Sequence, residues 1–442
     1  MMTVNNSKKG STTVFLSVIL SSLVMLSMAM IWSAEEHSIN SRIDGIVDLA
    51  GDSLMSEFHK EIYTDYGLFF INGDGSKLSS GLRLYADPTV SAMKNVSLSH
   101  ATASGSRYAL VDPGPVKDQI ISYMKSGGAD LILGREKTDP RSGGYHNLNH
   151  GPTIVSLPSR QVPDKSLLDY IGLTDRLGGV SEIFTQGSEK YLMGSYVLGT
   201  FNNRTGLADT DHFFHNEVEY ILCGKLTDAE NEKAVTRLLE ALRFPSNLSY
   251  IYTDTEKSAA LTAAAEAVAP GPLGLALKGA LACAWAWAES VNDAGLLMDG
   301  HKVPVVKTPG TWALDIGILL DSIAEGILDR DRFNVPEEES SPETYEDELK
   351  ELHDYEKDPD RMLKKNRPVI RPAEDRGLNY EQYLRILLFF KDEPQTVLRA
   401  LDLIQINVRK DHDGAFLIGE QSTGISMEVK ANGRNFQQDK TY

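Results

Sequence analysis

The segment Val14–Trp32 contains no charged residue, no proline and no glycine. At about 1.5 Å per residue, a helix of this length spans roughly 28 Å, close to the ~30 Å hydrocarbon core of a bilayer. The pair Lys8-Lys9 precedes it and the pair Glu35-Glu36 follows it, so positive charge is concentrated on one side. This asymmetry keeps residues 1–13 in the cytoplasm as a leader. We therefore predict a single-pass protein of the cell membrane with a cytoplasmic N-terminus and an extracellular C-terminal domain.

Two other interpretations of this segment remain open. A signal peptide cleaved after Ser27-Met28-Ala29 would release a secreted adhesin that begins at Met30. The apolar run continues through Trp32, which is unusual for the start of a mature chain. The segment is also the candidate core helix of a soluble domain, but such a helix normally has a polar face, and none is visible here. Both features favour an anchor in the lipid bilayer.

An amphipathic pattern follows the apolar segment directly. Apolar residues recur at spacings of three or four, as expected for one face of a helix. They are Ile39, Ile43, Ile46, Ala50, Leu54, Phe58 and Ile62. We predict that the membrane helix continues as an amphipathic stalk helix over residues 33–65. Tyr66–Ile71 then reads as a buried strand that ends in a turn at Asn72–Gly75.

The rest of the chain predicts an α+β fold with a helical C-terminal half. Residues 66–226 form a mixed α/β-containing ectodomain, with a helix at Val116–Lys125 and strands at Lys190–Phe201 and Glu217–Cys223. Residues 227–330 form a helical region that opens with capping boxes at Thr227–Glu230 and Thr253–Glu256. Within it, Leu273–Ala288 is apolar apart from Lys278 but is too short for a membrane span, so we predict a buried helix and keep a second span as the alternative.

The last third of the chain contains a linker and a small C-terminal region. Acidic residues and prolines dominate residues 331–377, which predicts a solvated linker with a charged helix at Tyr345–Tyr355. In residues 378–442 we expect amphipathic helices at Asn379–Phe390 and Gln395–Val408, followed by a final strand pair. The pair consists of Ala415–Gly419 and Gly424–Val429.

Charge and cysteine content exclude several classes of protein. The formal net charge is −18, which repels phosphate backbones and argues against nucleic acid as a partner. The chain has two cysteines, Cys223 and Cys283, too few for a disulfide scaffold, and their apolar neighbours predict buried free thiols.

Two pairs of histidines are the candidates for metal chemistry that we retain from the sequence. His212 and His215 form an HxxH pattern, whose side chains would share a face if the segment were helical. His146 and His150 lie together in a Gly/Asn-rich loop. No third ligand is evident for either pair, and the chain has no GxSxG, SxxK or P-loop motif. We therefore predict no catalytic residue, no cofactor and no metal ion, and retain His212 and His215 as weak candidates.

Several segments together resemble an uncharacterised family of membrane-anchored proteins from Gram-positive tight-adherence (Tad/Flp) pilus loci, similar to TadE/TadG pseudopilins. The matching segments are Lys9–Phe15, Tyr66–Phe69, Glu217–Leu222 with Gly224, Ala284–Glu289, Lys302–Pro304, Tyr380–Leu388, and Arg399–Asn407 with its Asp402 and Asn407. The resemblance implies cleavage by a leader peptidase between Gly10 and Ser11. It departs from pilins at Phe15, where they usually carry a glutamate.

These patterns predict a non-catalytic, extracytoplasmic accessory subunit of tight-adherence (type IVb-like) pilus assembly or adhesion. Its expected partners, implied by the resemblance, are other pilus-assembly membrane proteins or pseudopilins. The alternative is a membrane-tethered, metal-dependent enzyme or ligand-binding ectodomain that uses His212 and His215.

Overall fold

The computed structural model describes residues 9–93, 96–110, 112–128, 155–162, 180–209, 212–324 and 369–442. The candidate residues His146 and His150, the predicted helix Tyr345–Tyr355 and most of the acidic linker lie outside these ranges. The fold is a mixture of many helices and small sheets. It divides into two compact units. The sheet unit comprises Met1–Lys60, Phe69–Leu110 and Glu420–Tyr442, and the helical unit comprises Glu61–Leu68 and Val111–Gly419.

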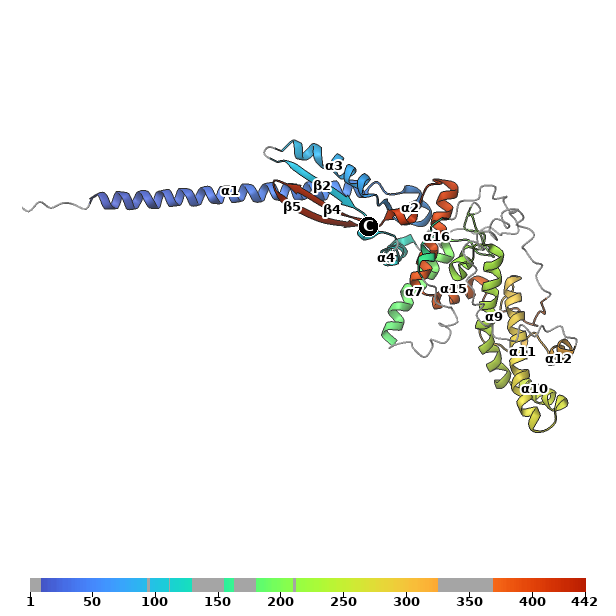
Figure 1. The fold of residues 1–442 in the computed structure, drawn as a ribbon. Coiled ribbons are helices and arrows are strands. Elements are labelled where there is room, and N and C mark those ends of the chain that lie inside the picture. The colour runs from blue at the N-terminus through green and yellow to red at the C-terminus, as the bar shows by residue number, and fades with distance from the viewer. Residues whose placement is uncertain are drawn as a thin grey trace, which may run out of the picture. The chain divides into compact units, whose positions relative to one another are not determined.

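The sheet unit contains two helices and five strands. They are α1 (Lys9–Met55), β1 (Ile71–Asn72), α3 (Gly75–Ser91), β2 (Leu98–Ser104), β3 (Gln421–Ser422), β4 (Gly424–Ala431) and β5 (Arg434–Thr441), with short 3-10 turns at Ser106–Tyr108 and Ile418–Glu420 flanking the strands. Strands β2, β4 and β5 form an antiparallel sheet with β4 in the centre, and β1 pairs with β3. The C-terminal half of α1 and helix α3 lie along this sheet (Figure 1).

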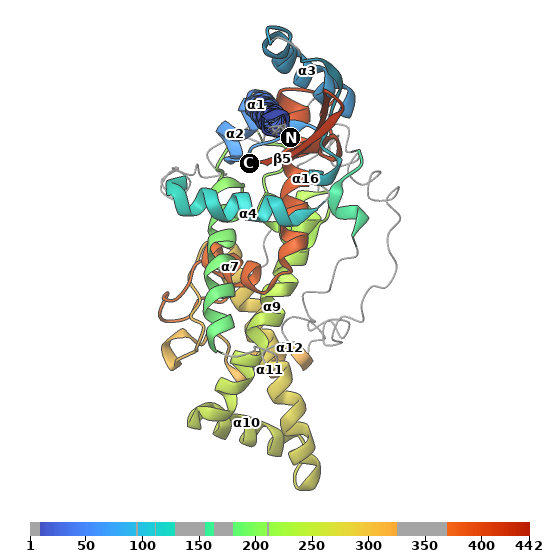
Figure 2. The ribbon, with the colours of Figure 1, turned by 90° about the vertical axis from the view of Figure 1, so that its left-hand side faces the viewer.

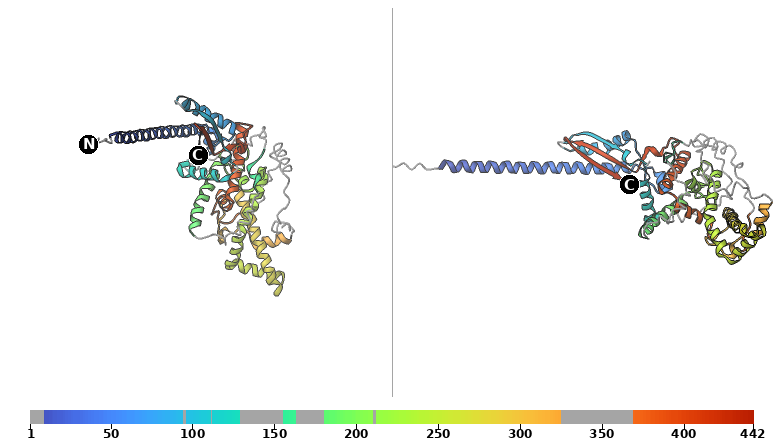
Figure 3. Two further views of the ribbon diagram at one scale, coloured as in Figure 1. Left: turned by 60° about the vertical axis from the view of Figure 1, so that its left-hand side comes forward. Right: turned by 60° about the horizontal axis from the view of Figure 1, so that its bottom comes forward.

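Helix α1 has two halves with opposite environments. From Val14 to Trp32 its large apolar side chains are exposed, with 63% of Val14 and 70% of Trp32 accessible. No element of the sheet unit lies beside this half in either view of Figure 3. Among the described residues, α1 is the one helix long and apolar enough to cross a membrane. Beyond Trp32 the predicted apolar stripe becomes the buried face, where Ile43, Ala50 and Leu54 pack into the core of the sheet unit.

The polar face of α1 pairs with the edge strand β5. Lys440 Nζ lies 2.6 Å from Asp48 Oδ1 and 2.7 Å from Asp52 Oδ1, and Gln438 Nε2 donates to Asp44 Oδ1 at 2.7 Å. Hydrogen bonds to these aspartates raise the pKa of Lys440. Such exposed pairs contribute little stability, but they cover the outer edge of the sheet with charged side chains.

The two glycines in the packed half of α1 have different surroundings. A methyl group at Gly45 would meet nothing within 4 Å, whereas at Gly51 it would collide with the Met427 side chain from β4. We expect Gly45→Ala to stabilise the sheet unit by up to about 1 kcal/mol, because alanine has the higher helix propensity. The matched variant Gly51→Ala should give no such gain. Hydrogen exchange of α1 amides measures both, and equal effects of the two variants would contradict this packing.

The helical unit is built from nine helices in its described part. They are α4 (Pro113–Tyr123), α7 (Val180–Thr200), α8 (Glu217–Cys223), α9 (Asp228–Thr253), α10 (Thr255–Val268), α11 (Pro272–Met298), α12 (Ile316–Ala324), α15 (Tyr380–Phe390) and α16 (Glu393–Asp411). The short helix α2 (Lys60–Tyr66) also belongs to this unit, except for its first residue. Short helical turns occur at Met124–Gly128, Pro158–Gln161 and Pro309–Thr311. Figure 2 shows α9, α10 and α11 packed together.

Several predicted helices are confirmed with small shifts. Helix α4 covers most of Val116–Lys125, α15 and α16 match the two C-terminal helices, and Leu273–Ala288 forms the first part of α11. The Thr227 side chain caps α9 by accepting from the Glu230 amide. The second cap lies one residue later than predicted, because the Asp254 side chain accepts from the Lys257 amide at 2.9 Å.

Two predicted strands are wrong. Lys190–Phe201 falls largely within α7, and Glu217–Cys223 is helix α8. All residues from Met193 to Thr200 and from Glu217 to Leu222 are buried. A helix enclosed on every side needs no polar face, so its sequence has no 3.6-residue period and resembles a buried strand.

Three other boundaries also differ from the prediction. Helix α1 ends at Met55 rather than continuing to residue 65, and α2 begins at Lys60. Of the predicted strand Tyr66–Ile71, only Ile71 lies in a strand. Strand β4 contains the predicted Gly424–Val429, but it pairs with β2 and with β5, whereas Ala415–Gly419 is not a strand.

Candidate functional site: two buried polar clusters

The helical unit contains two clusters of buried polar side chains. The α8 cluster consists of Tyr66, His212, Glu217, Glu219, Tyr220, Tyr380, Arg399, Asp402 and Asn407. The α11 cluster consists of Arg243, Asn247, Glu289, Ser290, Asp293, Lys307 and Thr311. Buried polar groups are costly unless they are paired, so each cluster is described first by its partners.

Glu217, at the N-terminal end of α8, holds three segments together. Its Oε2 accepts from the Asn202 amide and from His212 Nδ1, each at 2.8 Å. Its Oε1 accepts from Asn407 Nδ2 of α16 at 2.8 Å. Asn407 Nδ2 also lies 3.2 Å from the Tyr66 hydroxyl. Glu217 is fully buried, so all of these donors depend on one carboxylate.

Glu219, two residues after Glu217 on α8, has fewer hydrogen bonds than Glu217. Its Oε1 accepts from the Tyr380 hydroxyl at 2.8 Å and from the Arg204 amide at 3.1 Å. Its Oε2 has no hydrogen-bond partner among the described residues. Burial raises the pKa of Glu219 to about 7 against the opposing effect of these hydrogen bonds.

The other end of α8 is bound by α16. Tyr220 donates to Asp402 Oδ2 at 2.8 Å, and burial raises the pKa of Asp402 to about 6. Arg399 Nη1 donates to the carbonyls of Ile221 and Leu222, where the helix has no further amide to satisfy them. Gly224 ends α8 with a φ of 71°, and a side chain there would collide with the Arg399 guanidinium.

The predicted metal candidates do not form a helical pair. His212 and His215 lie in the irregular segment before α8, not on a helix face. His212 is buried against Glu217: burial alone lowers its pKa, but the Glu217 charge and hydrogen bond outweigh burial and raise it. The His215 amide donates to Asp228 Oδ2 at 3.2 Å. Within the described ranges, no group of three His, Cys, Asp or Glu side chains could hold a metal ion.

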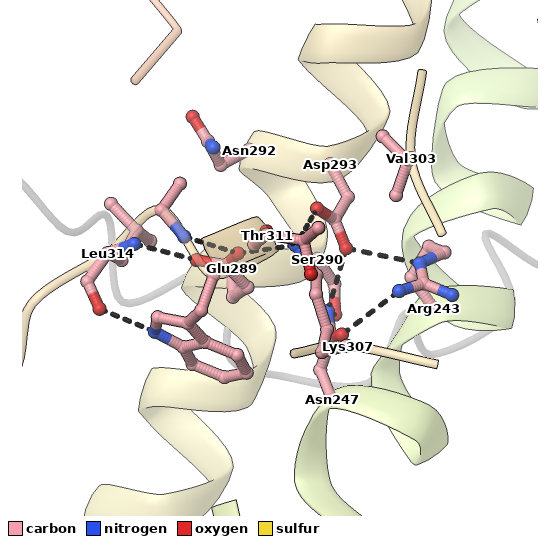
Figure 4. A network of polar contacts seen from close by, with 12 residues as sticks. Arg243, Asn247, Glu289, Ser290, Asn292, Asp293, Val303, Lys307, Thr311 and Leu314 are labelled. Carbon is pink, nitrogen blue, oxygen red and sulfur yellow. Dashed lines mark hydrogen bonds and ion pairs between the residues drawn. The ribbon is translucent and has the colours of Figure 1, made fainter. Parts of the chain in front are cut away.

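The α11 cluster joins α9, α11 and the segment after α11 (Figure 4). Lys307 Nζ lies 2.6 Å from Glu289 Oε1, 2.6 Å from Asp293 Oδ1 and 2.9 Å from the Thr311 carbonyl. On the other side, Asp293 Oδ2 accepts from Arg243 Nε at 3.1 Å and from Asn247 Nδ2 at 3.0 Å.

Glu289 is fixed by backbone as well as by Lys307. Its Oε1 accepts from the Ala313 amide at 3.0 Å and its Oε2 from the Leu314 amide at 2.9 Å. The Trp285 indole donates to the Leu314 carbonyl at 3.0 Å. The positive charges of Arg243 and Lys307 therefore neutralise the negative charges of Glu289 and Asp293. Water is excluded from the site, because all four side chains are at most 2% exposed.

Comparison with known sequences places this architecture in a family. Residues 155–433 match a family of unknown function (DUF5702). The chain belongs to this family. The DUF5702 match includes every residue of both clusters except Tyr66. Neither a curated protein nor a solved structure matches the chain.

Several segments quoted above for their sequence resemblance meet in this DUF5702 chain around α8. Tyr66, Asn407 and Glu217 share one network, and Tyr380 reaches Glu219. The α11 cluster was missed, although two signals could have indicated it. Arg243 and Asn247 continue the every-fourth-residue buried stripe of α9, and Glu289 and Asp293 interrupt an apolar helix at the same spacing.

The predicted burial of the two thiols is wrong. Cys283 is exposed on α11 and Cys223 is partly exposed at the end of α8, and no disulfide bond joins them. Alanine neighbours made Cys283 appear to lie in a core, but of the two residues beside it Ala282 is buried and Ala284 is partly exposed.

The raised pKa of Glu219 predicts a pH-dependent stability. The folded state binds this proton more tightly than the unfolded chain, so the contribution is present below pH 4.5 and is lost as the pH rises through about 7. A shift of this size corresponds to roughly 3 kcal/mol. Glu219→Gln keeps an acceptor for Tyr380 but removes the titration, so its unfolding free energy should fall less between pH 4.5 and 8. Urea unfolding at both pH values measures the difference; identical pH dependence of the two proteins would contradict it.

Proposed function

We propose that this protein is a non-catalytic, single-pass membrane subunit that displays its folded units outside the cell and serves tight-adherence pilus assembly or adhesion. The observation that carries the proposal is helix α1. Its first half exposes apolar side chains on all sides, and its second half buries an apolar stripe in the sheet unit without a break in the helix.

The side chains of the first half suit a lipid environment. Its serines return their hydroxyls to carbonyls of the preceding turn: Ser17 to Val14 at 2.8 Å, Ser22 to Val18 at 2.8 Å and Ser27 to Leu23 at 2.9 Å. Serine in this arrangement presents no unsatisfied donor to hydrocarbon. The lysines before the segment and the glutamates after it favour a cytoplasmic N-terminus.

Two observations support a role beside pilins. A long N-terminal helix whose second half packs on a small antiparallel sheet is the layout of pilin-like subunits, with which the leader Lys8–Ser11 also agrees. The segments that resemble proteins of tight-adherence loci contribute side chains to the α8 cluster. The partners in this proposal are pseudopilins and other membrane proteins of the assembly machinery.

Anchoring is tested by placing charge in the membrane segment. We expect Leu20→Arg combined with Val24→Arg to shift the protein from the membrane to the soluble fraction, because each arginine costs about 2.5–3.5 kcal/mol at the centre of a span. The control Leu49→Arg changes a leucine that is 67% exposed on the packed half of α1, and should leave membrane association unchanged. Retention of the double variant after alkaline extraction would contradict the anchor. Protease added to intact cells should degrade residues beyond 33 and spare the N-terminus.

The pilus role needs a separate genetic test. Deleting the gene should reduce the number of surface pili and the adhesion of the cells, and the wild-type gene supplied in trans should restore both. Complementation with the anchor double variant should fail, while complementation with Leu49→Arg should succeed. Normal piliation of the deletion strain would refute this role and leave the membrane anchor unaffected.

The alternative enzyme lacks a comparable observation. His212 Nδ1 is 2.8 Å from Glu217 Oε2, so a metal ion would have to bind the other ring nitrogen, Nε2, and the described residues around it supply no group of three metal-binding side chains. Elemental analysis of the purified protein tests this directly. A stoichiometric metal that is lost in the His212→Ala, His215→Ala double variant would favour the enzyme.

A further inference from the structure

We propose that Lys307 and Asp293 are joined by an intramolecular amide bond, formed between Lys307 Nζ and Asp293 Cγ with Glu289 as the proton-transfer group. This covalent modification is independent of the proposed pilus role. It follows from the arrangement of the α11 cluster, where an amine, a carboxyl group and a second carboxylate are in contact in a buried site (Figure 4).

The reacting groups are already at contact distance. Lys307 Nζ is 2.6 Å from Asp293 Oδ1, and both side chains are held by elements packed in the same unit. Asp293 lies on α11, and Lys307 lies on the segment that follows it, whose Thr308 and Thr311 side chains form a capping box. Because the fold already holds the two groups together, the reaction avoids the entropy cost of a bimolecular encounter.

The reacting groups are closed off from water. Lys307 is 1% exposed at its side chain, and Glu289 and Asp293 are 0% exposed. Burial raises the pKa of Glu289 in the direction that lets it accept the proton that the Lys307 ammonium must lose.

Asp293 is polarised on the oxygen that faces away from the amine. Its Oδ2 accepts from Arg243 Nε at 3.1 Å and from Asn247 Nδ2 at 3.0 Å. Attack on Cγ would place negative charge on this oxygen, where two fixed donors stabilise it as in an oxyanion hole. Oδ1, which faces Lys307 Nζ, is then the leaving oxygen.

The atoms balance without any other reactant. Glu289 takes one proton from the Lys307 ammonium and passes it to Asp293 Oδ1, which leaves a neutral amine and a neutral carboxylic acid. The amine nitrogen attacks Cγ and forms the C–N bond, and the electron pair moves to Oδ2. A second Nζ proton passes through Glu289 to the Oδ1 hydroxyl, the C–Oδ1 bond breaks and one water leaves. The C=Oδ2 bond reforms, and Glu289 returns to its initial state.

The surroundings of the bond oppose its hydrolysis. The Trp312 ring lies 5.8 Å from Lys307 Nζ, and Trp285 packs edge-on against Trp312. After condensation Glu289 keeps its hydrogen bonds from the Ala313 and Leu314 amides, and Arg243 still donates to the oxygen of the new amide.

Peptide mapping of the full-length protein tests the proposal. The protein is purified from membranes, denatured and digested with trypsin. A linked chain should yield Gly279–Lys302 joined to Val303–Arg330, uncut after Lys307, with the summed mass of the two peptides less one water. Fragmentation should place the join between Asp293 and Lys307. Separate peptides Val303–Lys307 and Thr308–Arg330, with no linked species, would overturn the proposal from the wild-type protein alone.

Two variants test the assigned roles. Lys307→Arg retains the cation but cannot form this amide, and should restore tryptic cleavage after residue 307. Glu289→Gln keeps the shape of the side chain but cannot carry the proton, and should give the unlinked peptides, with the fold checked by circular dichroism. A linked peptide in Glu289→Gln would refute the role of Glu289.

Discussion

Met427→Asp is expected to unfold the sheet unit locally and to leave the helical unit folded. Met427 lies on the central strand β4, is 0% exposed and packs among Ile43, Val47 and Ala103 in the same core. An aspartate at this position replaces a buried apolar side chain with a charge surrounded by the apolar residues of this core. Burying it or opening the sheet to hydrate it costs roughly 4 kcal/mol, a large part of the stability of a small unit.

Hydrogen–deuterium exchange measures this effect separately in each unit. Peptides from β2, β4 and β5 should lose protection, while peptides from α9 and α11 should keep it. The control Glu428→Gln changes the neighbouring residue, whose side chain points to the exposed face of β4, and should shift stability by less than about 0.5 kcal/mol. Full protection of β4 in Met427→Asp would show that this strand is not the centre of the core.

Glu217→Ala is expected to destabilise the helical unit by about 3–5 kcal/mol. The substitution removes the acceptor of the Asn202 amide, His212 Nδ1 and Asn407 Nδ2 at once. Each donor is buried, so water cannot easily replace the carboxylate, and the penalty exceeds that of a lost surface hydrogen bond.

Urea unfolding followed by tryptophan fluorescence measures this loss, because Trp285, Trp287 and Trp312 all lie in the helical unit. Glu266→Ala is the matched control, since Glu266 is exposed on α10 and the same substitution there removes no buried partner. A midpoint for Glu217→Ala equal to that of the control would mean that the α8 cluster does not stabilise the fold.

Residue pattern predicts elements in which apolar and polar residues alternate with a helical period. The apolar stripe of α1 from Ile39 to Leu54 and the helices α9 and α15 were predictable, because each has a periodic apolar face or a recognisable cap. Helix α16 was also predicted, although its residues from Gln395 to Val408 are all buried, because several of those buried residues are polar and preserve the period. Helices α7 and α8 were mistaken for strands because burial on every side removes that period. The partner of β4 was also mistaken: its sequence neighbour Ala415–Gly419 was chosen, and the pairing with β2 depends on contacts distant in sequence.

The candidate sites, too, depend partly on local sequence patterns and partly on how distant segments pack together. His212 was noticed because of a spacing with its neighbour His215, but its environment is set by Glu217 and by the charge and burial around it. The α11 cluster combines residues 243, 289, 293 and 307, which no local motif connects. Its polar positions on two helices are visible in the sequence as interruptions of apolar stripes, whereas their meeting is a property of how α9 packs on α11.

Strand β2 pairs with β4 across a long interval of sequence; the Ser99 hydroxyl, for example, donates to the Lys430 carbonyl 331 residues away. During synthesis the apolar stripe of α1 therefore emerges from the ribosome long before the strands that cover it exist. Strands β4 and β5 are needed to complete this core. If translation stops before they are made, the apolar stripe remains exposed, and quality-control proteases can recognise the unfinished product.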